Sequence, residues 1–503
     1  MSCPESEAGW REAPVPRSRF SIHAWLGGLS LVLLLAALGC SGGTGPRDNP
    51  RAALPQAPAP VKHAAMIHGQ FASPQDVTRA CLKCHPGAAA EVMATSHWTW
   101  ESDTAISPLT GQTIGIGKKN ILNNFCIGVQ GNERHCMACH AGYGWKDASF
   151  DFNRAENIDC LVCHDTTGSY RKDPEGAGLP AADVDLLHVA QSVGRPSRRN
   201  CGSCHFAGGG GDAVKHGDLD GTLAVRAGGE DVHMGRYDMA CQDCHRTARH
   251  AIRGRLISLS NRVERDVACT DCHSARPHAQ QRLNAHTTTV SCQACHIPKY
   301  AVEAATKMQW DWSQAGQDRP GADPLTYSKK KGSFSFDTDV VPEFFWFNGE
   351  VKLYLPGEKL NPAQVLQLNR PQGSIRDPRA KIFPFKVHRG RQVYDAGNNY
   401  LLVPRTVGPG GYWAEFDWDQ ALRLGSQSSG LPYSGRYGFV DSAMYWPITH
   451  MVAPKEQALQ CTDCHGARGQ LNWQALGYSG DPAQRGGRTE STLSASNSAG
   501  GRR

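Results

Sequence analysis

The apolar positions of this chain form one long run near the N-terminus and only short, interrupted clusters after it. The run covers about 15 residues, 24–38, and follows the basic residues Arg11, Arg17 and Arg19. A membrane-spanning helix needs about 20 apolar residues, whereas a signal-peptide core has about 7 to 15 behind a basic segment. The pattern therefore predicts an export signal over residues 1–39.

This export signal ends in Leu38-Gly39-Cys40, which is similar to the cleavage box of bacterial lipoproteins. In that interpretation Cys40 carries lipid and tethers the mature chain to the membrane. An ordinary cleaved signal and an uncleaved anchor are the alternatives, and each of the three exports the chain to the periplasm or to the cell surface. Residues 40–62 are rich in Gly, Pro and Ala and are predicted to be a flexible linker.

The remaining pattern predicts short helices, irregular segments and an aromatic cap. Residues 262–268 are predicted to form a helix that enters Cys269, but most segments between 63 and 300 are too short for long elements. Residues 297–460 hold six of the twelve tryptophans and aromatic runs such as 342–347, so 301–460 is interpreted as a cap on the rest. Residues 479–503 contain mainly Gly, Ser and Arg and are predicted to be disordered.

Cysteine spacing changes this picture, because sixteen of the 19 cysteines belong to eight copies of Cys-x-x-Cys-His. This motif is the attachment site of c-type haem. Its two thiols form thioether bonds to the porphyrin, and its histidine binds one face of the iron. The eight copies are Cys81, Cys84 and His85; Cys136, Cys139 and His140; Cys160, Cys163 and His164; Cys201, Cys204 and His205; Cys241, Cys244 and His245; Cys269, Cys272 and His273; Cys292, Cys295 and His296; and Cys461, Cys464 and His465.

Eight copies exclude a disulfide framework, a zinc protein and a thioredoxin-like enzyme as the main interpretation. The net charge of +6, with 20% charged residues, gives no signal for nucleic acid, and we expect no nucleic-acid partner. The expected cofactors are eight covalently attached haem c groups.

The motifs lie so close together that the haems must pack against one another. Seven of them fall between Cys81 and His296, about 31 residues per haem. We therefore expect a multihaem cytochrome c fold, mainly α with much irregular structure, organised around eight packed haems. Its parts are a seven-haem body with the active site over 63–300, the haem-free cap over 301–460, and the eighth haem over 461–478.

An electron-carrying haem usually has a second protein ligand, so the histidines outside the motifs are candidates for the sixth iron position. Twelve such histidines follow residue 40. The candidates are His68, His97, His216, His233, His250, His278, His286 and His450, whereas His63, His135, His188 and His388 are interpreted as bystanders. The sequence does not assign a given histidine to a given haem.

Two further features indicate more than electron transfer. Cys126 follows Asn123 and Asn124 and is the one thiol of the mature chain outside the haem motifs and the possible lipid site. Residues 208–218 begin with four glycines, which allow close backbone approach, and continue with Asp212, Lys215 and His216. A buried inert cysteine and a flexible linker are the plainer interpretations of these two features.

In motif order, in spacing and in residues 208–218 and 450–465, the chain resembles the octahaem tetrathionate reductases. The resemblance implies that the second haem is the active site and that Lys215 is its sixth ligand. It also implies that Asp212 is an acidic neighbour, that Cys126 and Asn123 line the pocket, and that the other seven haems have two histidine ligands. One of the eight candidate histidines is then a bystander. The family is related to pentahaem nitrite reductase and to hydroxylamine oxidoreductase.

The resemblance implies reduction of small inorganic substrates, namely tetrathionate, nitrite or hydroxylamine. Lysine binds iron only as the neutral amine, so it is a replaceable ligand, and Lys215 or Asp212 would supply protons once it leaves. We expect an electron donor in the membrane or periplasm, such as a quinol-linked cytochrome. The alternatives are a non-catalytic electron-transfer cytochrome and a hydroxylamine-oxidising enzyme, whose family uses a tyrosine cross-link for which no local pattern is found here.

Overall fold

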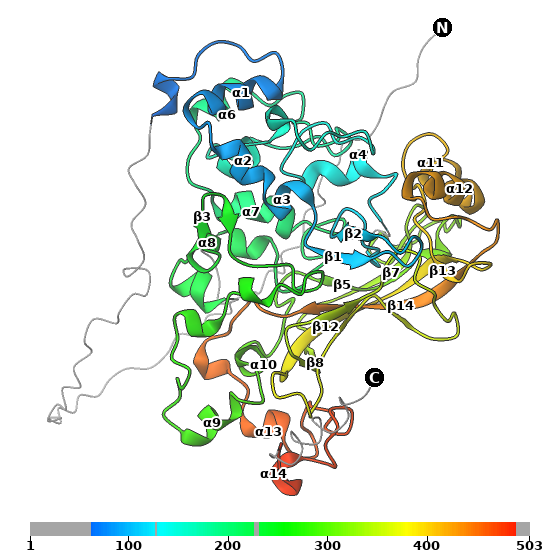
Figure 1. Cartoon of the computed structure of the whole chain (residues 1–503). Helices are drawn as coiled ribbons and strands as arrows, with labels where there is room; N and C mark the ends of the chain where they lie inside the picture. The colour runs from blue at the N-terminus through cyan, green and yellow to red at the C-terminus, as the bar shows by residue number, and fades with distance from the viewer. Residues whose placement is uncertain (1–61, 126–127, 226–230, 489–503) are drawn as a thin grey trace, which may run out of the picture. The chain divides into compact units, whose positions relative to one another are not determined.

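A computed structural model describes residues 62–125, 128–225 and 231–488 (Figure 1). The chain divides into two units, Met1–Asp48 and Asn49–Arg503, and every described residue belongs to the second. The predicted export signal, Cys40 and nearly all of the linker lie outside the described residues. Cys126 also lies outside them. Among the described residues, no helix is both long and apolar enough to cross a bilayer.

Short helices carry most of the haem-attachment motifs. Seven motifs lie on or at the end of an α-helix of one to three turns, because a single turn is enough to bring both thiols and the histidine onto one side. The helices are α1 Pro74–Cys84, α2 Ala88–Met93, α3 Ser96–Thr99, α4 Glu133–Cys136, α5 Leu161–His164, α6 Leu186–Gln191, α7 Arg198–His205, α8 Cys241–Cys244, α9 Gln281–His286, α10 Cys292–His296, α11 Tyr412–Glu415, α12 Trp418–Ser429, α13 Cys461–Cys464 and α14 Pro482–Arg485.

The helix predicted over residues 262–268 is wrong. Only one 3-10 turn forms there, η7 Val263–Arg265. The side chains bond to a neighbouring loop instead: the Arg265 guanidinium donates to the carbonyls of Gly254 and Ile252, and Asp266 pairs with Arg255. These tertiary contacts replace the hydrogen bonds that a continued helix would make.

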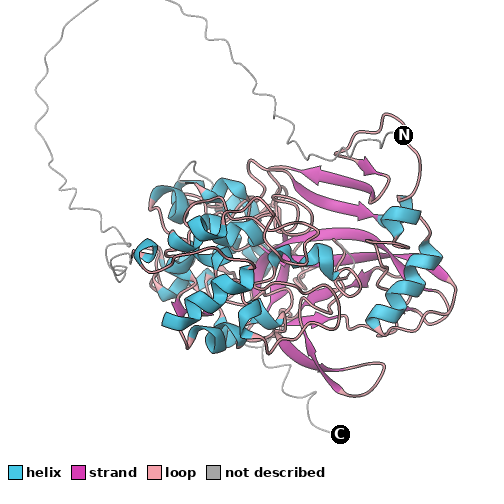
Figure 2. Ribbon diagram, turned by 90° about the horizontal axis from the view of Figure 1, so that it is seen from above, coloured by secondary structure: helices cyan, strands magenta, loops and turns pink. Residues whose placement is uncertain are grey.

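The cap over 301–460 is a β-structure, which corrects the expectation of a mainly α fold. Its eight-stranded mixed sheet has the order β10-β14-β12-β5-β7-β6, with β13 and β8 also paired to β12. The strands of the described residues are β1 Asp103–Ile106, β2 Thr113–Ile116, β3 Thr247–Ala248, β4 Ala251–Ile252, β5 Thr306–Asp311, β6 Tyr327–Ser328, β7 Gly332–Asp337, β8 Glu343–Phe347, β9 Val351–Leu353, β10 Leu366–Gln367, β11 Asn369–Pro371, β12 Lys381–Asp395, β13 Tyr400–Leu401 and β14 Tyr437–Pro447. Figure 2 shows most helices gathered beside this sheet rather than within it.

The two longest strands, β12 and β14, run antiparallel from the pair Phe385 and Pro447 to the pair Asp395 and Tyr437. Because successive side chains of a strand point to opposite faces, the even-numbered residues of β12 share one face. Three of them, Lys386, His388 and Gln392, are almost completely buried. A polar buried face explains why the strand does not read as an alternation of apolar and polar residues.

The largest hydrophobic cluster is built mainly from the sheet and α12, whereas the clusters among the motifs are small. Many motif cysteines are exposed or half-exposed in the described chain. The motif region is therefore the part whose core must be completed by packed macrocycles.

The segment expected to be disordered from residue 479 has structure up to residue 488. Asp481 caps α14 and its carboxylate bonds to His465. The Arg488 guanidinium lies 5.0 Å from the centre of the Trp346 ring and donates to the Ala380 carbonyl. These contacts connect the C-terminal segment to the eighth motif and to β8. Residues 489–503 lie outside the described part.

Candidate functional site: paired imidazoles and a lysine-lined motif

Six motif histidines each face a second imidazole. The pairs are His205 with His97, His164 with His250, His245 with His450, His273 with His233, His296 with His278, and His465 with His286, with ring centres 6.0 to 6.4 Å apart. Metal–imidazole bonds are about 2 Å long, so one iron between two imidazoles separates the ring centres by about 6 Å. The described side chains therefore fit haem iron with two histidine ligands at six motifs.

The ring nitrogens are arranged for the same chemistry. A histidine that ligates metal through one nitrogen usually donates from the other to an oxygen, which fixes its orientation. Nδ1 of His164, His245 and His286 lies 2.8 to 3.0 Å from a backbone carbonyl oxygen. Nδ1 of His250 and His465 lies 2.8 and 2.6 Å from the carboxylates of Glu91 and Asp481. In each of these, Nε2 is left for the iron.

The pKa values of His205 and His97, the pair at the fourth motif, also suit ligation. Burial lowers the pKa of His205 to about 3, and burial lowers the pKa of His97 below its ordinary value. Both imidazoles are therefore neutral near pH 7, and neutral imidazole is the form that binds metal. His450 differs: burial lowers its pKa, but the hydrogen bond and charge of Asp218 outweigh burial and raise it.

The motifs adjoin one another in a definite order. The thiols of four motif pairs lie close enough to shift each other's pKa: Cys81 with Cys160, Cys139 with Cys204, Cys201 with Cys241, and Cys269 with Cys292. Charges also act between Cys163 and Cys201, Cys244 and Cys272, and Cys295 and Cys461. The motifs thus form one row in the order first, third, fourth, fifth, sixth, seventh, eighth, and the second motif adjoins the fourth.

The second motif has different surroundings. His140 is fully buried, and its ring contacts the rings of Trp98, Trp100, Trp145, Phe150 and Phe152. Its Nε2 lies 2.6 Å from the Trp98 carbonyl oxygen. In the described ranges, no second imidazole faces His140 at the distance seen in the six pairs.

Three lysines gather at this second motif. Lys118, Lys172 and Lys215 all lie close enough to Cys139 to act on it electrostatically. Lys172 is buried and its amine donates to the Gly142 carbonyl at 3.1 Å, beside Asp159 at 3.0 Å. The Lys118 amine lies 4.1 Å from the centre of the Trp100 ring. The site therefore combines an apolar wall with several cationic groups.

Lys215 lies between the glycine-rich segment and the sheet. Its amine is 4.7 Å from the centre of the Trp446 ring, on β14. A side chain at Gly208 or Gly209 would approach the Lys215 side chain to 3.4 or 3.2 Å, so these two glycines make room for it. Residue 209 also adjoins Phe125, which brings residues 208–218 beside residues 123–125.

The face of β12 with Lys386, His388 and Gln392 holds both segments. The Asn123 carbonyl accepts a hydrogen bond from Gln392 at 2.8 Å, and the Asn124 side chain bonds to His388 at 2.8 Å. The Phe125 ring stacks on the His388 ring, with centres 3.8 Å apart. Asn123 and Lys215 are thus brought to one face of the sheet. His388, interpreted from sequence as a bystander, and Lys386 are buried parts of this site that sequence reasoning missed.

Several candidate residues are placed elsewhere. Asp212 is exposed, and its carboxylate accepts from the Gly221 backbone N–H at 2.8 Å. His216 contacts the Trp446 ring rather than a motif histidine. His68 is exposed, with Nε2 3.1 Å from the Ala65 carbonyl oxygen, whereas His63 lies in electrostatic range of His164 together with His85.

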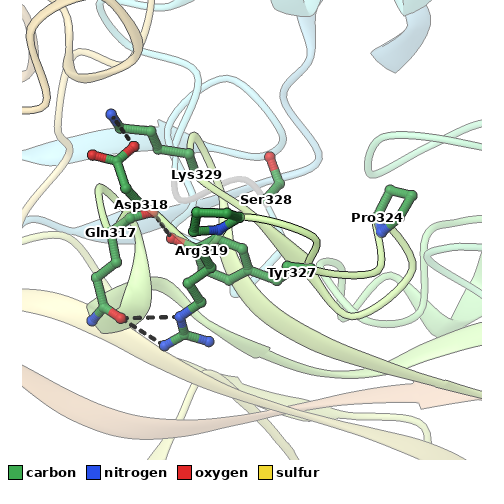
Figure 3. Close-up of a pocket in the computed structure, with 9 residues that line it drawn as sticks. Gln317, Asp318, Arg319, Pro324, Tyr327, Ser328 and Lys329 are labelled. Atoms are coloured by element: carbon green, nitrogen blue, oxygen red, sulfur yellow. Dashed lines mark hydrogen bonds and ion pairs between the residues drawn. The ribbon is translucent and has the colours of Figure 1, made fainter.

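A surface pocket of about 350 Å³ lies in the loop before β7 (Figure 3). The guanidinium of Arg319 lies 4.3 Å from the centre of the Tyr327 ring, and Lys329 pairs with Asp318 at 2.7 Å. None of the candidate site residues lines this pocket.

The chain is similar to known cytochromes over most of its length. Residues 307–468 match the model of the family described as cytochrome c bacterial. A solved structure from Shewanella oneidensis, described as octaheme cytochrome c, has 46% sequence identity and a TM-score of 0.78, and the match covers 84% of this chain and 98% of that chain. A curated protein of Archaeoglobus fulgidus, described as uncharacterized, is 22% identical over an alignment of 239 residues that covers 38% of this chain and 80% of that protein.

Proposed function

This chain belongs to the octahaem c-type cytochromes, which carry covalently bound haem c, and from that premise we propose that it is an exported reductase with eight haems. Its proposed substrates are tetrathionate, nitrite or hydroxylamine, reduced at the second motif. Cys136 and Cys139 would attach the porphyrin and His140 would bind its iron, and this haem would supply electrons and an exchangeable ligand position there.

One observation carries the proposal. Six motif histidines face a second imidazole, whereas His140 faces aromatic rings and has the Lys215 amine beside its motif. Two strong imidazole ligands suit electron transfer, because they leave no position for substrate. An amine ligand is replaceable, so this difference supports Lys215 as the sixth ligand and the second motif as the place of reaction.

The surrounding residues suit small anions. Lys118 adds positive charge that attracts tetrathionate or nitrite to the site, whereas the charge of Lys172 is balanced by Asp159. Trp98, Trp100 and Trp145 exclude water from the buried His140 side of the site. When Lys215 is displaced, its amine is free to hold a proton and to donate it to the substrate.

The other motifs fit electron delivery. The row that ends at the first and eighth motifs passes the fourth motif, which adjoins the second, so electrons entering at either end reach the reaction site. We assign His63 rather than His68 as the partner of His85, because His63 and His85 both lie in electrostatic range of His164 in the third motif. His216 is then a bystander to the irons.

The proposed location is the periplasm or the outward face of the membrane, with a lipid anchor at Cys40 and a quinol-linked cytochrome as electron donor. These proposals rest on the N-terminal sequence and on the family.

The test is turnover of the purified holoprotein with a reduced viologen as donor, against tetrathionate, nitrite and hydroxylamine separately. Intact mass should first show eight haems per chain. We expect turnover with at least one of the three substrates. No turnover in protein with a full set of haems favours the alternative, a non-catalytic electron-transfer cytochrome.

A further inference from the structure

Lys386 is a lysine in the interior of the sheet whose amine contacts three oxygen atoms. Its side chain is fully buried on β12. The amine donates to the carbonyls of Val214 at 3.0 Å and Lys215 at 2.9 Å, and to the hydroxyl of Thr306 on β5. Two of its three partners therefore belong to the peptide that carries Lys215.

The three contacts account for every donor that a lysine ammonium has. The Thr306 hydroxyl donates its own proton to the Ala213 carbonyl at 2.7 Å, so towards Lys386 it acts as an acceptor. Burial lowers the pKa of Lys386 well below its ordinary value. Three acceptor oxygens oppose that shift, because only the ammonium form has a proton for each of them. Lys386 and Thr306 together hold the backbone carbonyls of residues 213, 214 and 215.

The held segment needs such support, because its own backbone is not regular. Gly209 has φ of +80° and Ala213 has φ of +60°, a region in which a residue with a side chain is strained. Residues 208–218 lie in none of the helices or strands of the described chain. Contacts from β12 and β5 therefore determine where Lys215 lies.

We propose that Lys386 is a positioning residue that holds Lys215 in place beside the second motif. The proposal rests on the proposed function, because it takes Lys215 as the exchangeable ligand. Lys386 acts on the backbone of residues 214 and 215 and touches neither substrate nor iron.

Lys307 provides a matched control. It is a buried lysine of the neighbouring strand β5, but its amine lies over aromatic rings, 3.5 Å from the centre of Trp310 and 4.3 Å from that of Phe334. Lys386→Met and Lys307→Met both replace a buried amine by an apolar chain of similar length, and only the first removes contacts to residues 214 and 215.

The experiment compares the two variants and wild type as holoproteins, by electron paramagnetic resonance of the lysine-ligated component and by nitrite and tetrathionate turnover. We expect Lys386→Met to lose that component while the paired-imidazole signals remain. We also expect kcat to fall about 100-fold, the loss that a misplacement of about 1 Å produces. Lys307→Met should retain the component and the turnover.

The outcomes separate the two proposals. A wild-type protein without a lysine-ligated component contradicts the proposed role of Lys215. If wild type has the component and Lys386→Met keeps it with unchanged kcat, Lys386 has no positioning role. Should Lys386→Met fail to bind its haems, Thr306→Val is measured instead; it removes one contact of Lys386 and the bond to Ala213. A weakened lysine-ligated component in that variant supports the proposal, and an unchanged component contradicts it.

Discussion

The second and third motifs have the same Cys-x-x-Cys-His signature and different surroundings. At the third motif, His164 faces His250, and both Nδ1 atoms are anchored, on the Gly194 carbonyl and on Glu91. At the second motif, His140 lies among aromatic rings, and Lys215 lies in electrostatic range of Cys139. The signature is therefore the same at both motifs, whereas segments distant in sequence determine which side chains face the motif histidine.

Exchanging the lysine should have the largest effect. In Lys215→Leu the haem content and the paired-imidazole signals should remain, but the lysine-ligated component should disappear. Turnover of nitrite or tetrathionate should fall by about 10²-fold or more, the contribution of a positioned proton donor. Lys299→Leu, which removes an exposed lysine paired with Asp339, is the control. Unchanged spectra and turnover in Lys215→Leu would show that Lys215 is not the ligand that distinguishes the second motif from the third.

Removing the imidazole that faces His164 tests whether the third motif can also become a reaction site. His250→Ala should leave one additional iron accessible to added cyanide or carbon monoxide, since the facing imidazole is gone. It should not create a second reaction site, because the cluster of three lysines lies at the second motif. We therefore expect a smaller loss of turnover than in Lys215→Leu. Turnover above wild type would show that any open haem of this chain reduces substrate.

The first motif, like the third, should have a second histidine as the partner of its motif histidine. His63→Ala should convert one low-spin haem into a ligand-accessible one, whereas His68→Ala should leave the spectrum as in wild type. The reason is that His63 and His85 both lie in electrostatic range of His164 in the third motif. Optical and electron paramagnetic resonance spectra of the two variants decide the assignment. The reverse result would restore His68 as the ligand, as first inferred from sequence.

The sequence was informative where chemistry depends on local spacing. The Cys-x-x-Cys-His pattern is local, and six of the candidate histidines, such as His97 and His450, do face a motif histidine. The sheet was not predicted, because Lys386, His388 and Gln392 place polar groups on a buried face of β12 and hide its alternation. Those groups are buried because they bond to residues 123–124 and 214–215, and such a partnership is visible only in three dimensions.

The smallest expected effect concerns the carboxylates that contact axial histidines. The Glu91 carboxylate lies 2.8 Å from Nδ1 of His250, and a carboxylate partner makes a ligating imidazole more basic. A more basic ligand stabilises ferric iron and lowers the reduction potential.

In Glu91→Gln the hydrogen bond can remain but the charge is lost, so the potential of the third haem should rise by on the order of 60 mV, which is a tenfold change for a one-electron couple. Asp481→Asn should raise the potential of the eighth haem in the same way, because Asp481 contacts His465. Glu264→Gln, at an exposed carboxylate paired with Arg262, is the control. Spectroelectrochemical titration resolves the shift, and equal potentials in Glu91→Gln and Glu264→Gln would show that Glu91 orients His250 without tuning its iron.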